Sequence, residues 1–386
     1  MKRWNTASAL NKGGVSMICN AMGLILADHK RIQLGELTQP RALAAVPFGG
    51  RYRIIDYMLS IMVNSGIITV GIIALNKYKS LMDHLGTGSY WDLDRKTKGL
   101  SILPPYINSQ NIGKGGEIDD LSGLLDYFKA NASQYVILAN SNCVFNAKLN
   151  DFICRHHESG ADMSVLYNRD GICYGSPSLI LSLDQNDYIS DLLQDPAKPA
   201  SDRCSLGVMV IGRELLIDLI SESIARGEHD FAVDNLLKKY RQYKIMGHEY
   251  KGLVLRVNSI ATYFASSMRL LEESTRRELF WSGLPVFTKV KDEAPALYFA
   301  GNSVSNCLVA DGCKISGSAA GSTLFRGVTV SRNAVLKNCI VLQDSYISEG
   351  VELENVILDK NCHIRPGIKL VGQPDYPAVI GKGAVV

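Results

Sequence analysis

Aliphatic residues recur at every sixth position through the C-terminal part of the chain. From Val304 onward the spacing connects Val309 and Ile315; Leu324 and Val330; Val335, Val341, Ile347 and Leu353; and Leu358, Ile364 and Leu370. One inward aliphatic residue per hexapeptide is typical of a parallel β-helix, whose coils bury these residues only against neighbouring coils. A β-sandwich would instead alternate with period two over longer strands. We therefore predict a left-handed β-helix over residues 301–386, with turns that absorb one residue after Val330 and after Leu353.

A different pattern occupies residues 17–258, where short apolar runs alternate with amphipathic stretches. This alternation is typical of βαβ units around a mostly parallel, doubly wound sheet. The predicted strands are Met22–Ala27, Thr69–Leu75, Tyr135–Ala139, Met163–Tyr167, Ser178–Leu183, Leu206–Ile211 and Leu253–Val257. The predicted helices are Tyr52–Asn64, Asp119–Asn131, Lys148–Glu158 and Arg213–Arg226. Such folds bind ligands at the carboxyl ends of their strands, so we expect a site beginning after Ala27.

The segments outside these two domains are predicted from local signals. A helix from Ser259 to Glu273, with Ser259 at its N-cap, leads into a stretch that contains Pro285 and Pro295. Residues 259–300 are therefore interpreted as a linker helix and connection. Residues 1–16 are polar and aperiodic, and we interpret them as a leader or a disordered extension.

The composition excludes several classes of partner. The chain has 386 residues and a formal net charge of +3, with no long Lys/Arg block, which argues against nucleic acid or a membrane surface. The longest early apolar run, Met17–Ala27, is shorter than the roughly 18 residues that cross a bilayer. Nine cysteines show no CxxC pair and no zinc-like spacing, so we expect a reduced, cytoplasmic protein.

Two stretches are more specific than these patterns. The first is VPFGGRYRIIDY at residues 46–57, and the second combines DHLGTG at 83–88, WDLDR at 91–95 and ILPPY at 102–106. Together they closely resemble bacterial glucose-1-phosphate adenylyltransferase, also called ADP-glucose pyrophosphorylase, which supplies ADP-glucose for glycogen biosynthesis. The likeness covers nearly everything after residue 17. It implies a nucleotidyltransferase-like domain followed by the β-helix.

The resemblance also implies a triphosphate-binding loop, GGxGxRL, directly after the first strand. Glycines there let backbone N–H groups approach phosphate closely, and the arginine balances developing charge. In this chain Asp28, His29 and Arg31 replace the three glycines, and Gln33 replaces the arginine. One interpretation is that Lys30 and Arg31 bind phosphate in a new way, and the interpretation we favour is a solvated loop.

The other charged positions that the resemblance implies are replaced as well. Leu43 stands at the lysine of the family's AKPAVPFGG, Ser141 at the magnesium aspartate of SGDH, and Arg256 at the second metal aspartate, in WxDVGT. Asp195 falls on the sugar-phosphate lysine of EEKP, although Lys198 lies close enough to leave that alignment open. Mg²⁺ prefers carboxylate oxygens, so we expect no metal cofactor. A fixed guanidinium could still hold a nucleotide statically.

Three further sets of residues have two interpretations each. Arg41 and Arg53 match positions that, in the resembling family, help bind anionic sugar-phosphate effectors, and ordinary surface ion pairs are the alternative. The neighbouring His156 and His157 have no third ligand in sight, so we expect a solvated or capping role. His363 is similar to the histidine of hexapeptide acyltransferases, but no other residue supports acyl transfer.

The family's framework is retained, but its phosphate-binding and metal-binding residues are replaced, and this combination leads to a functional hypothesis. Each lost stabiliser typically costs about 3 kcal/mol, and the metal clamp several more, so we expect negligible catalysis. The pattern resembles the non-catalytic GlgD-type subunit, which pairs with a catalytic GlgC-type subunit in mixed tetramers. The hypothesis is a regulatory subunit that shifts its partner's activity. An active nucleotidyltransferase with a rebuilt site, or a free-standing sugar-phosphate or nucleotide sensor, are the alternatives.

Overall fold

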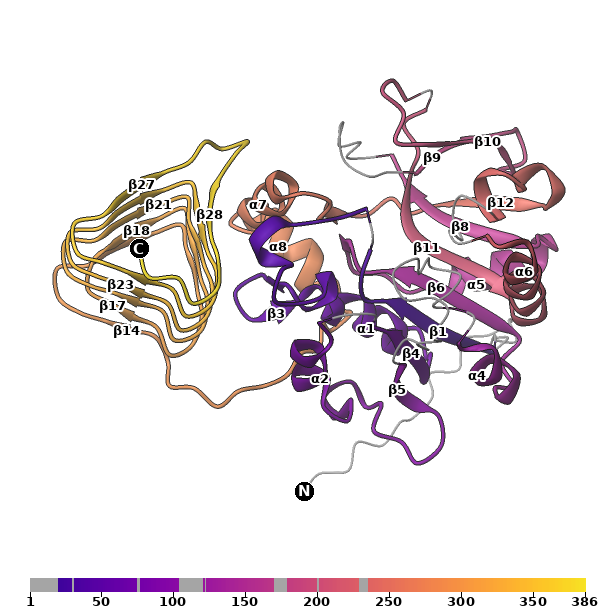
Figure 1. The fold of residues 1–386 in the computed structure, drawn as a ribbon, viewed down its shortest axis with the longest axis horizontal. Coiled ribbons are helices and arrows are strands. Elements are labelled where there is room, and N and C mark those ends of the chain that lie inside the picture. Colours follow the sequence, from indigo (N-terminus) through magenta and orange to yellow (C-terminus); the bar gives the residue numbers. More distant parts are fainter. Residues whose placement is uncertain are drawn as a thin grey trace.

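The computed structural model describes residues 20–29, 31–74, 77–103, 121, 123–169, 179–199, 201–228 and 235–386. Within these ranges the chain forms an α/β domain and a three-sided β-helix that lie side by side (Figure 1). The extension interpreted from residues 1–16 lies outside the described residues, as does Lys30. None of the described helices has the length and apolar character needed to cross a bilayer.

The α/β domain is built on a mixed nine-stranded sheet whose path runs β10-β9-β11-β6-β1-β4-β5, and β8 pairs with β11 on one side and with β12 on the other. Strands β1, β4, β5 and β6 are parallel, whereas β11 runs antiparallel to both β6 and β8. The sheet is thus less parallel than predicted, because a strand buried on both faces has a continuous apolar run in either direction. The strands are β1 (Ala21–Leu26), β4 (Thr69–Ile73), β5 (Gly99–Leu103), β6 (Tyr135–Asn140), β8 (Met163–Asn168), β9 (Leu179–Leu183), β10 (Ile189–Gln194), β11 (Cys204–Gly212) and β12 (Ile245–Glu249).

Helices cover both faces of this sheet, which confirms the doubly wound fold class. Residues of α1 and α5 enter one core cluster and residues of α4 and α6 the other. The helices are α1 (Ile54–Asn64), α2 (Lys79–Leu85), α4 (Leu125–Ala130), α5 (Asn150–Ser159) and α6 (Arg213–Arg226). Short elements complete the domain: η1 (Gly35–Leu37), η2 (Leu43–Ala45), η3 (Ser89–Trp91), η5 (Tyr240–Gln242), β2 (Pro47–Phe48) and β3 (Tyr52–Arg53).

Two predicted elements differ from those observed. The strand predicted over Leu253–Val257 shrinks to β13 (Leu255–Arg256), which pairs with β7 (Cys143–Val144) outside the main sheet. The helix predicted over Ser259–Glu273 is capped by Ser259 as expected, but it divides into α7 (Ile260–Arg269) and α8 (Glu273–Phe280). The break falls where Glu272 adopts extended backbone, and neither proline nor glycine marks it in the sequence.

The β-helix has three parallel faces of five strands each, and they form the triangular prism visible in Figure 1. The first face holds β14 (Leu297–Tyr298), β17 (Lys314–Ile315), β20 (Thr329–Val330), β23 (Tyr346–Ile347) and β26 (His363–Ile364). The second holds β15 (Ser303–Ser305), β18 (Ser318–Ala320), β21 (Val335–Lys337), β24 (Glu352–Glu354) and β27 (Lys369–Val371). The third holds β16 (Leu308–Val309), β19 (Thr323–Leu324), β22 (Ile340–Val341), β25 (Val356–Leu358) and β28 (Ala378–Ile380).

One inward position differs from the predicted repeat. Leu336, not Val335, aligns with Ala319 and Leu353 and is fully buried. Counted on Leu336, the spacing of six continues unbroken from Val330, and the shorter step lies between Leu336 and Val341. Asn338 and Asn355 occupy these tight corners with positive φ angles of 49° and 53°. Asparagine is among the few residues that adopt this left-handed conformation readily.

The third face of the β-helix packs against the α/β domain. Its outward residues Ile340 and Ile357 join Phe48 and Tyr263 in one buried cluster. A buried ion pair crosses the same interface: Nη2 of Arg41 lies 2.9 Å from Oδ1 of Asp359, and the two side chains are 2% and 0% exposed. The two domains therefore share a core and a charge pair.

Candidate functional site

The loop after β1 folds back on its own backbone. Oδ1 of Asp28 accepts a hydrogen bond of 3.2 Å from the backbone N–H of Leu43, the first residue of η2. The backbone N–H of Ala44 donates to the carbonyl of Ala27 at 2.9 Å. The Leu43 side chain, 2% exposed, lies in the core beneath. The Asp28 carboxylate thus engages the Leu43 amide that borders the loop.

Farther along this loop, Arg31 reaches across to the strand that precedes Asp195. Nη1 of Arg31 lies 3.6 Å from Oδ2 of Asp195, and the two side chains are 36% and 41% exposed. Gln33 is exposed, and so is Lys198. Such a solvated pair contributes at most about 1 kcal/mol. The structure thus shows that Arg31 and Asp195, which the sequence gives as two unrelated substitutions, form an ion pair.

Ser141 and Arg256 are both buried at the ends of their strands. Oγ of Ser141 donates to the carbonyl of Leu26 at 3.0 Å. The Arg256 guanidinium, in a residue 5% exposed, donates to the carbonyls of Cys204 and Ser205 at 3.3 and 3.0 Å and to Oδ1 of Asn168 at 2.6 Å. Among the described residues no carboxylate lies within ion-pair distance of it, and its Nε has no hydrogen-bond partner.

Arg31 and Arg256 border a cleft at the carboxyl ends of β1 and β6, which we call the strand-end cleft. One part of about 110 Å³ is largely apolar and is lined by Leu26, Leu138, Val165, Met209 and Leu236. The adjoining part of about 70 Å³ is polar and is lined by Arg31, Asn142, Gln194 and Arg256. Residues shared by both parts are His29, Asn140, Leu179, Ser205 and Gly207. The cleft lies where the sequence predicted a ligand site.

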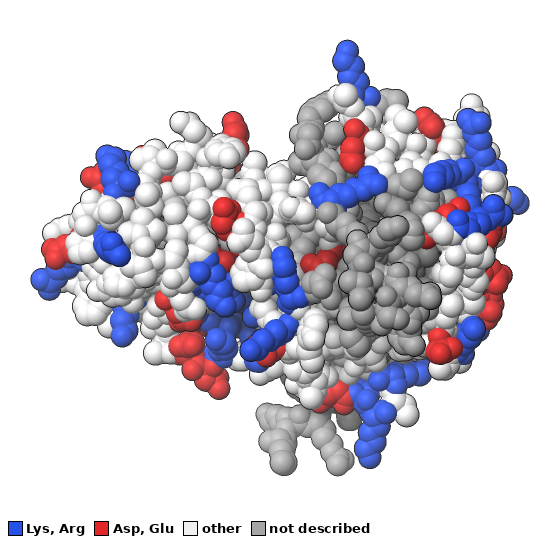
Figure 2. All heavy atoms as spheres, in the orientation of Figure 1, with Lys and Arg blue, Asp and Glu red and all other residues white. Residues whose placement is uncertain are grey.

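A second pocket, of about 250 Å³, lies between the domains, and we call it the interdomain pocket. Figure 2 shows Lys and Arg side chains gathered where the two domains meet. The lining residues are Arg51, Arg53, Asp83, His84, Lys289, Lys291, Arg326, Gln343, Asp344 and Lys360. Six of these are Lys or Arg and only two are acidic. Nε and Nη2 of Arg326 and Oε1 of Gln343 are buried there without a partner among the described residues.

The floor of this pocket is a buried hydrogen-bond network centred on Asp56. Oδ1 of Asp56 lies 2.6 Å from Nε2 of His84, and Oδ2 accepts from the backbone N–H of Arg53 and from the hydroxyl of Thr288. Burial lowers the pKa of His84 despite the neighbouring carboxylate. Burial likewise lowers the pKa of Arg53 to about 10, so its guanidinium stays charged near neutrality. The network fixes α1, α2 and the connection before the β-helix around the pocket.

Comparison with known proteins supplies the relatives of this chain. The nucleotidyl transferase family matches residues 22–250, and the GlmU-like, C-terminal hexapeptide family matches residues 298–375. The glycogen biosynthesis protein GlgD of Bacillus subtilis (strain 168) is 34% identical over 365 residues, which cover 94% of this chain and 96% of that protein. The glucose-1-phosphate adenylyltransferase of Thermotoga maritima is 31% identical over 82% of this chain and 76% of its own length. The chain belongs to this family of GlgD proteins and adenylyltransferases.

Within this family, the resemblance places two magnesium aspartates at the positions of Ser141 and Arg256, and these residues do not fit a divalent cation. The Arg256 guanidinium repels one, and the Ser141 hydroxyl is already directed at a carbonyl oxygen. No group of three or more His, Cys, Asp or Glu side chains in the described part of the chain could hold a metal ion.

Arg41 and Arg53, predicted together as effector ligands, lie in different surroundings. Arg53 lines the interdomain pocket and donates to the carbonyl and hydroxyl of Ser80. Arg41 is buried against Asp359 and also donates to the carbonyl of Leu37 at 3.1 Å. Its ion pair joins the domains and does not lie on the surface.

The sequence reasoning missed most of the interdomain pocket. The missing signal is a second period: Arg326, Gln343 and Lys360 stand 17 residues apart, one full coil of the β-helix. The same corner of successive coils therefore brings these three side chains to one pocket. Arg51, Lys289 and Lys291 reach it from the α/β domain and the connection.

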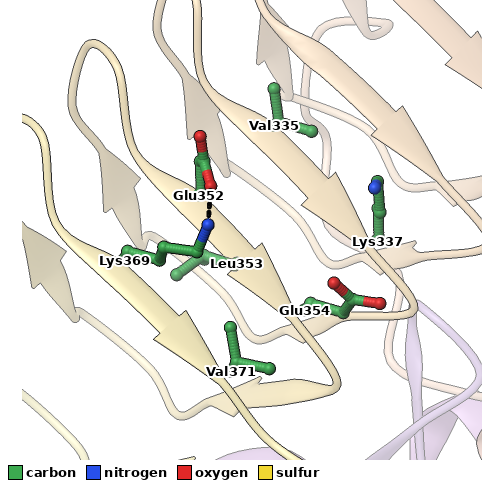
Figure 3. A pocket seen from close by; sticks show the side chains of 7 residues that line it. All are labelled: Val335, Lys337, Glu352, Leu353, Glu354, Lys369 and Val371. Carbon is green, nitrogen blue, oxygen red and sulfur yellow. Dashed lines mark ion pairs between the residues drawn. The ribbon is translucent and has the colours of Figure 1, made fainter.

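A hollow on the β-helix and the histidines singled out in the sequence have ordinary structural contacts. A hollow on the second face is lined by Val335, Lys337, Glu352, Leu353, Glu354, Lys369 and Val371, and Figure 3 shows Glu352 directed at Lys369, 2.6 Å away. His156, expected to be solvated or capping, is instead 3% exposed and hydrogen-bonded to Ser164. His363 is exposed, and its Nε2 lies 3.3 Å from Oγ of Ser348.

Proposed function

We propose that this chain is a non-catalytic regulatory subunit of a hetero-oligomeric ADP-glucose pyrophosphorylase. It modulates a catalytic partner that makes ADP-glucose from ATP and glucose 1-phosphate for glycogen biosynthesis. The observation that carries this proposal is the buried Arg256 guanidinium, which stands where the family places a metal-binding aspartate. The similarity to proteins named for glycogen biosynthesis supports the pathway.

The chemistry of the strand-end cleft supports a non-catalytic role. Nucleotidyl transfer depends on positioned cations and backbone N–H groups that neutralise phosphate charge. Asp28 precedes His29, which lines this cleft, and accepts a hydrogen bond from the amide of Leu43, while the lining residue Arg31 is paired with Asp195. The Arg31 guanidinium is thus already matched by a carboxylate, and the Leu43 amide already donates to Asp28.

The same cleft also favours a second, narrower function. The unpartnered Nε of Arg256 borders its polar part, and the apolar part lies next to it. That arrangement suits static binding of a nucleotide without turnover. An active nucleotidyltransferase with a rebuilt site and a free-standing sensor are the competing hypotheses.

We further propose that the interdomain pocket binds an anionic effector of the sugar-phosphate class. Its six cations come from the α/β domain, the connection and the β-helix, so one compact anion would reduce the repulsion among all three. Buried, unpartnered donors on Arg326 are suited to phosphate oxygens. An effector bound here would contact the α/β domain, the connection and the β-helix at once.

Co-expression with a catalytic homologue from the same organism tests the subunit proposal. We expect a stable mixed complex, measured by native mass, and a shifted apparent substrate affinity relative to the catalytic subunit alone. As a control, a catalytic partner that lacks its own metal aspartates should give an inactive complex. Failure to associate, or unchanged kinetics, would favour the free-standing sensor instead.

The effector proposal is tested with Arg326→Met. Its Nε and Nη2 have no partner among the described residues, so this change removes charge from the pocket while breaking few existing contacts. Cyclic trimetaphosphate serves as a compact trianionic probe in titration calorimetry. We expect affinity to fall about 10- to 100-fold, because a charge-assisted hydrogen bond contributes about 1.5–3 kcal/mol. The exposed Arg332→Met is the matched control, and equal loss in both variants would contradict the assignment.

A further inference from the structure

Lys360 is a half-buried lysine of the interdomain pocket, at the end that the β-helix contributes. Among the described residues no carboxylate lies within ion-pair distance of its Nζ. In the adjacent Asp359, Oδ1 accepts from Arg41 and from the backbone N–H of Lys360 itself, whereas Oδ2 is buried and has no hydrogen-bond partner among the described residues. In the described part of the chain the ammonium group therefore makes no ion pair, and Asp359 is the carboxylate whose charge acts on it against the nearby arginines.

Lysine is the residue that responds to such surroundings by losing a proton. Burial and neighbouring like charges both disfavour an ammonium, whereas a guanidinium keeps its charge. Here burial, followed by Arg53 and Arg41, lowers the pKa of Lys360 to about 7. Burial also lowers the pKa of Arg326, which nonetheless stays protonated near neutrality.

We propose that the interdomain pocket binds its anion together with a proton taken up by Lys360, so that anion affinity falls as the pH rises above neutrality. This inference rests on the proposed anion site. In the reaction, the neutral amine of Lys360 takes one proton from solvent and becomes an ammonium, which the bound anion then stabilises. No bond other than N–H forms, and no other reactant is needed. The pocket would thereby couple effector binding to pH.

Other charged groups around Lys360 influence its protonation before the anion binds. Those that act on it directly are Arg53, Arg41, Asp359 and Lys382. The pocket adds Arg51, Asp83, His84, Lys289, Lys291, Arg326 and Asp344. Of these, His84 is the other group that can titrate near neutrality, and its lowered pKa moves its protonation to more acidic solution. Proton uptake above about pH 7 is therefore assigned to Lys360.

Calorimetry of the full chain with trimetaphosphate, in two buffers of different ionisation enthalpy, measures proton uptake directly. The charge of this probe does not change in the range used. From a pKa of about 7, we expect uptake of about 0.1 proton at about pH 6, 0.5 at about pH 7 and 0.9 at about pH 8. Affinity should approach a tenfold loss per pH unit above about pH 7 and level off below it.

Lys360→Arg is the matched variant, because arginine keeps the positive charge without titrating. It should bind the probe with no proton uptake above about pH 7 and with a flat affinity profile. Lys360→Met should bind more weakly, also without uptake. Binding with equal uptake in wild type and Lys360→Arg would overturn this inference while leaving the anion site intact. No binding by the wild type would instead overturn the proposed effector site.

Discussion

Purified alone and supplied with ATP, glucose 1-phosphate and Mg²⁺, the chain is expected to release pyrophosphate at least ~10⁴-fold more slowly than the roughly 10 s⁻¹ typical of enzymes. The expectation follows from the surroundings of two buried residues. Ser141 donates its hydroxyl proton to the carbonyl of Leu26, and Arg256 keeps a guanidinium among carbonyl and amide oxygens. Neither offers a carboxylate to a divalent cation.

The magnitude follows from the number of stabilisers that are absent. Loss of one preorganised donor costs about 10²- to 10³-fold in rate, and loss of a metal clamp costs several kcal/mol more. Such losses are not strictly additive, so ~10⁴-fold is a lower figure than the full sum of about 3 kcal/mol per lost donor and several kcal/mol for the metal would give. The phosphate loop adds to the deficit, because Asp28 occupies the Leu43 amide.

The rate should be measured with chain expressed in a host that lacks its own adenylyltransferase. A catalytic homologue prepared in the same way provides the reference rate. Turnover within tenfold of that reference would contradict the proposed function and support an active enzyme with a rebuilt site. Nucleotide binding without turnover would be consistent with static binding beside Arg256.

Residue identities at the strand-end cleft could be predicted from the sequence, but their partners could not. The sequence indicates that Asp28 adds a negative charge where the family has a glycine and that Arg256 reverses the charge of a metal aspartate. It does not indicate that Asp28 caps the backbone of η2, or that Arg256 is held by Asn168 and two carbonyls. Those contacts join segments that are far apart in the chain, so local pattern carries no signal for them.

The β-helix shows how a period can be correct while a residue assignment is not. Val335 and Leu336 are both aliphatic, and only the strand register identifies Leu336 as the inward one. The interdomain pocket depends on that register as well, since the 17-residue spacing of Arg326 and Lys360 acquires meaning only when the coil length is known. Arg53 was predictable because a family motif contains it.

Replacement of Arg41 by methionine is expected to lower the free energy of unfolding by about 3–5 kcal/mol. The change leaves the Asp359 carboxylate, 0% exposed, without its charged partner at the domain interface. Methionine fills much of the arginine's volume, so the loss reports the unpaired charge more than a cavity. The cost is large because burial prevents water from replacing the lost interaction.

Urea unfolding followed by tryptophan fluorescence, to which the buried Trp91 and the exposed Trp281 contribute, measures this loss. Glu352→Gln is the matched control, since it breaks an exposed ion pair of similar length and should cost no more than about 1 kcal/mol. Arg41→Met combined with Asp359→Leu should recover most of the stability, because removing both charges leaves neither one buried and unpaired. Equal effects of Arg41→Met and Glu352→Gln would show that the buried pair does not hold the two domains together. Recovery in the double variant would show that the loss in Arg41→Met comes from the unpaired buried charge and not from lost packing. The single variant alone cannot distinguish these two causes.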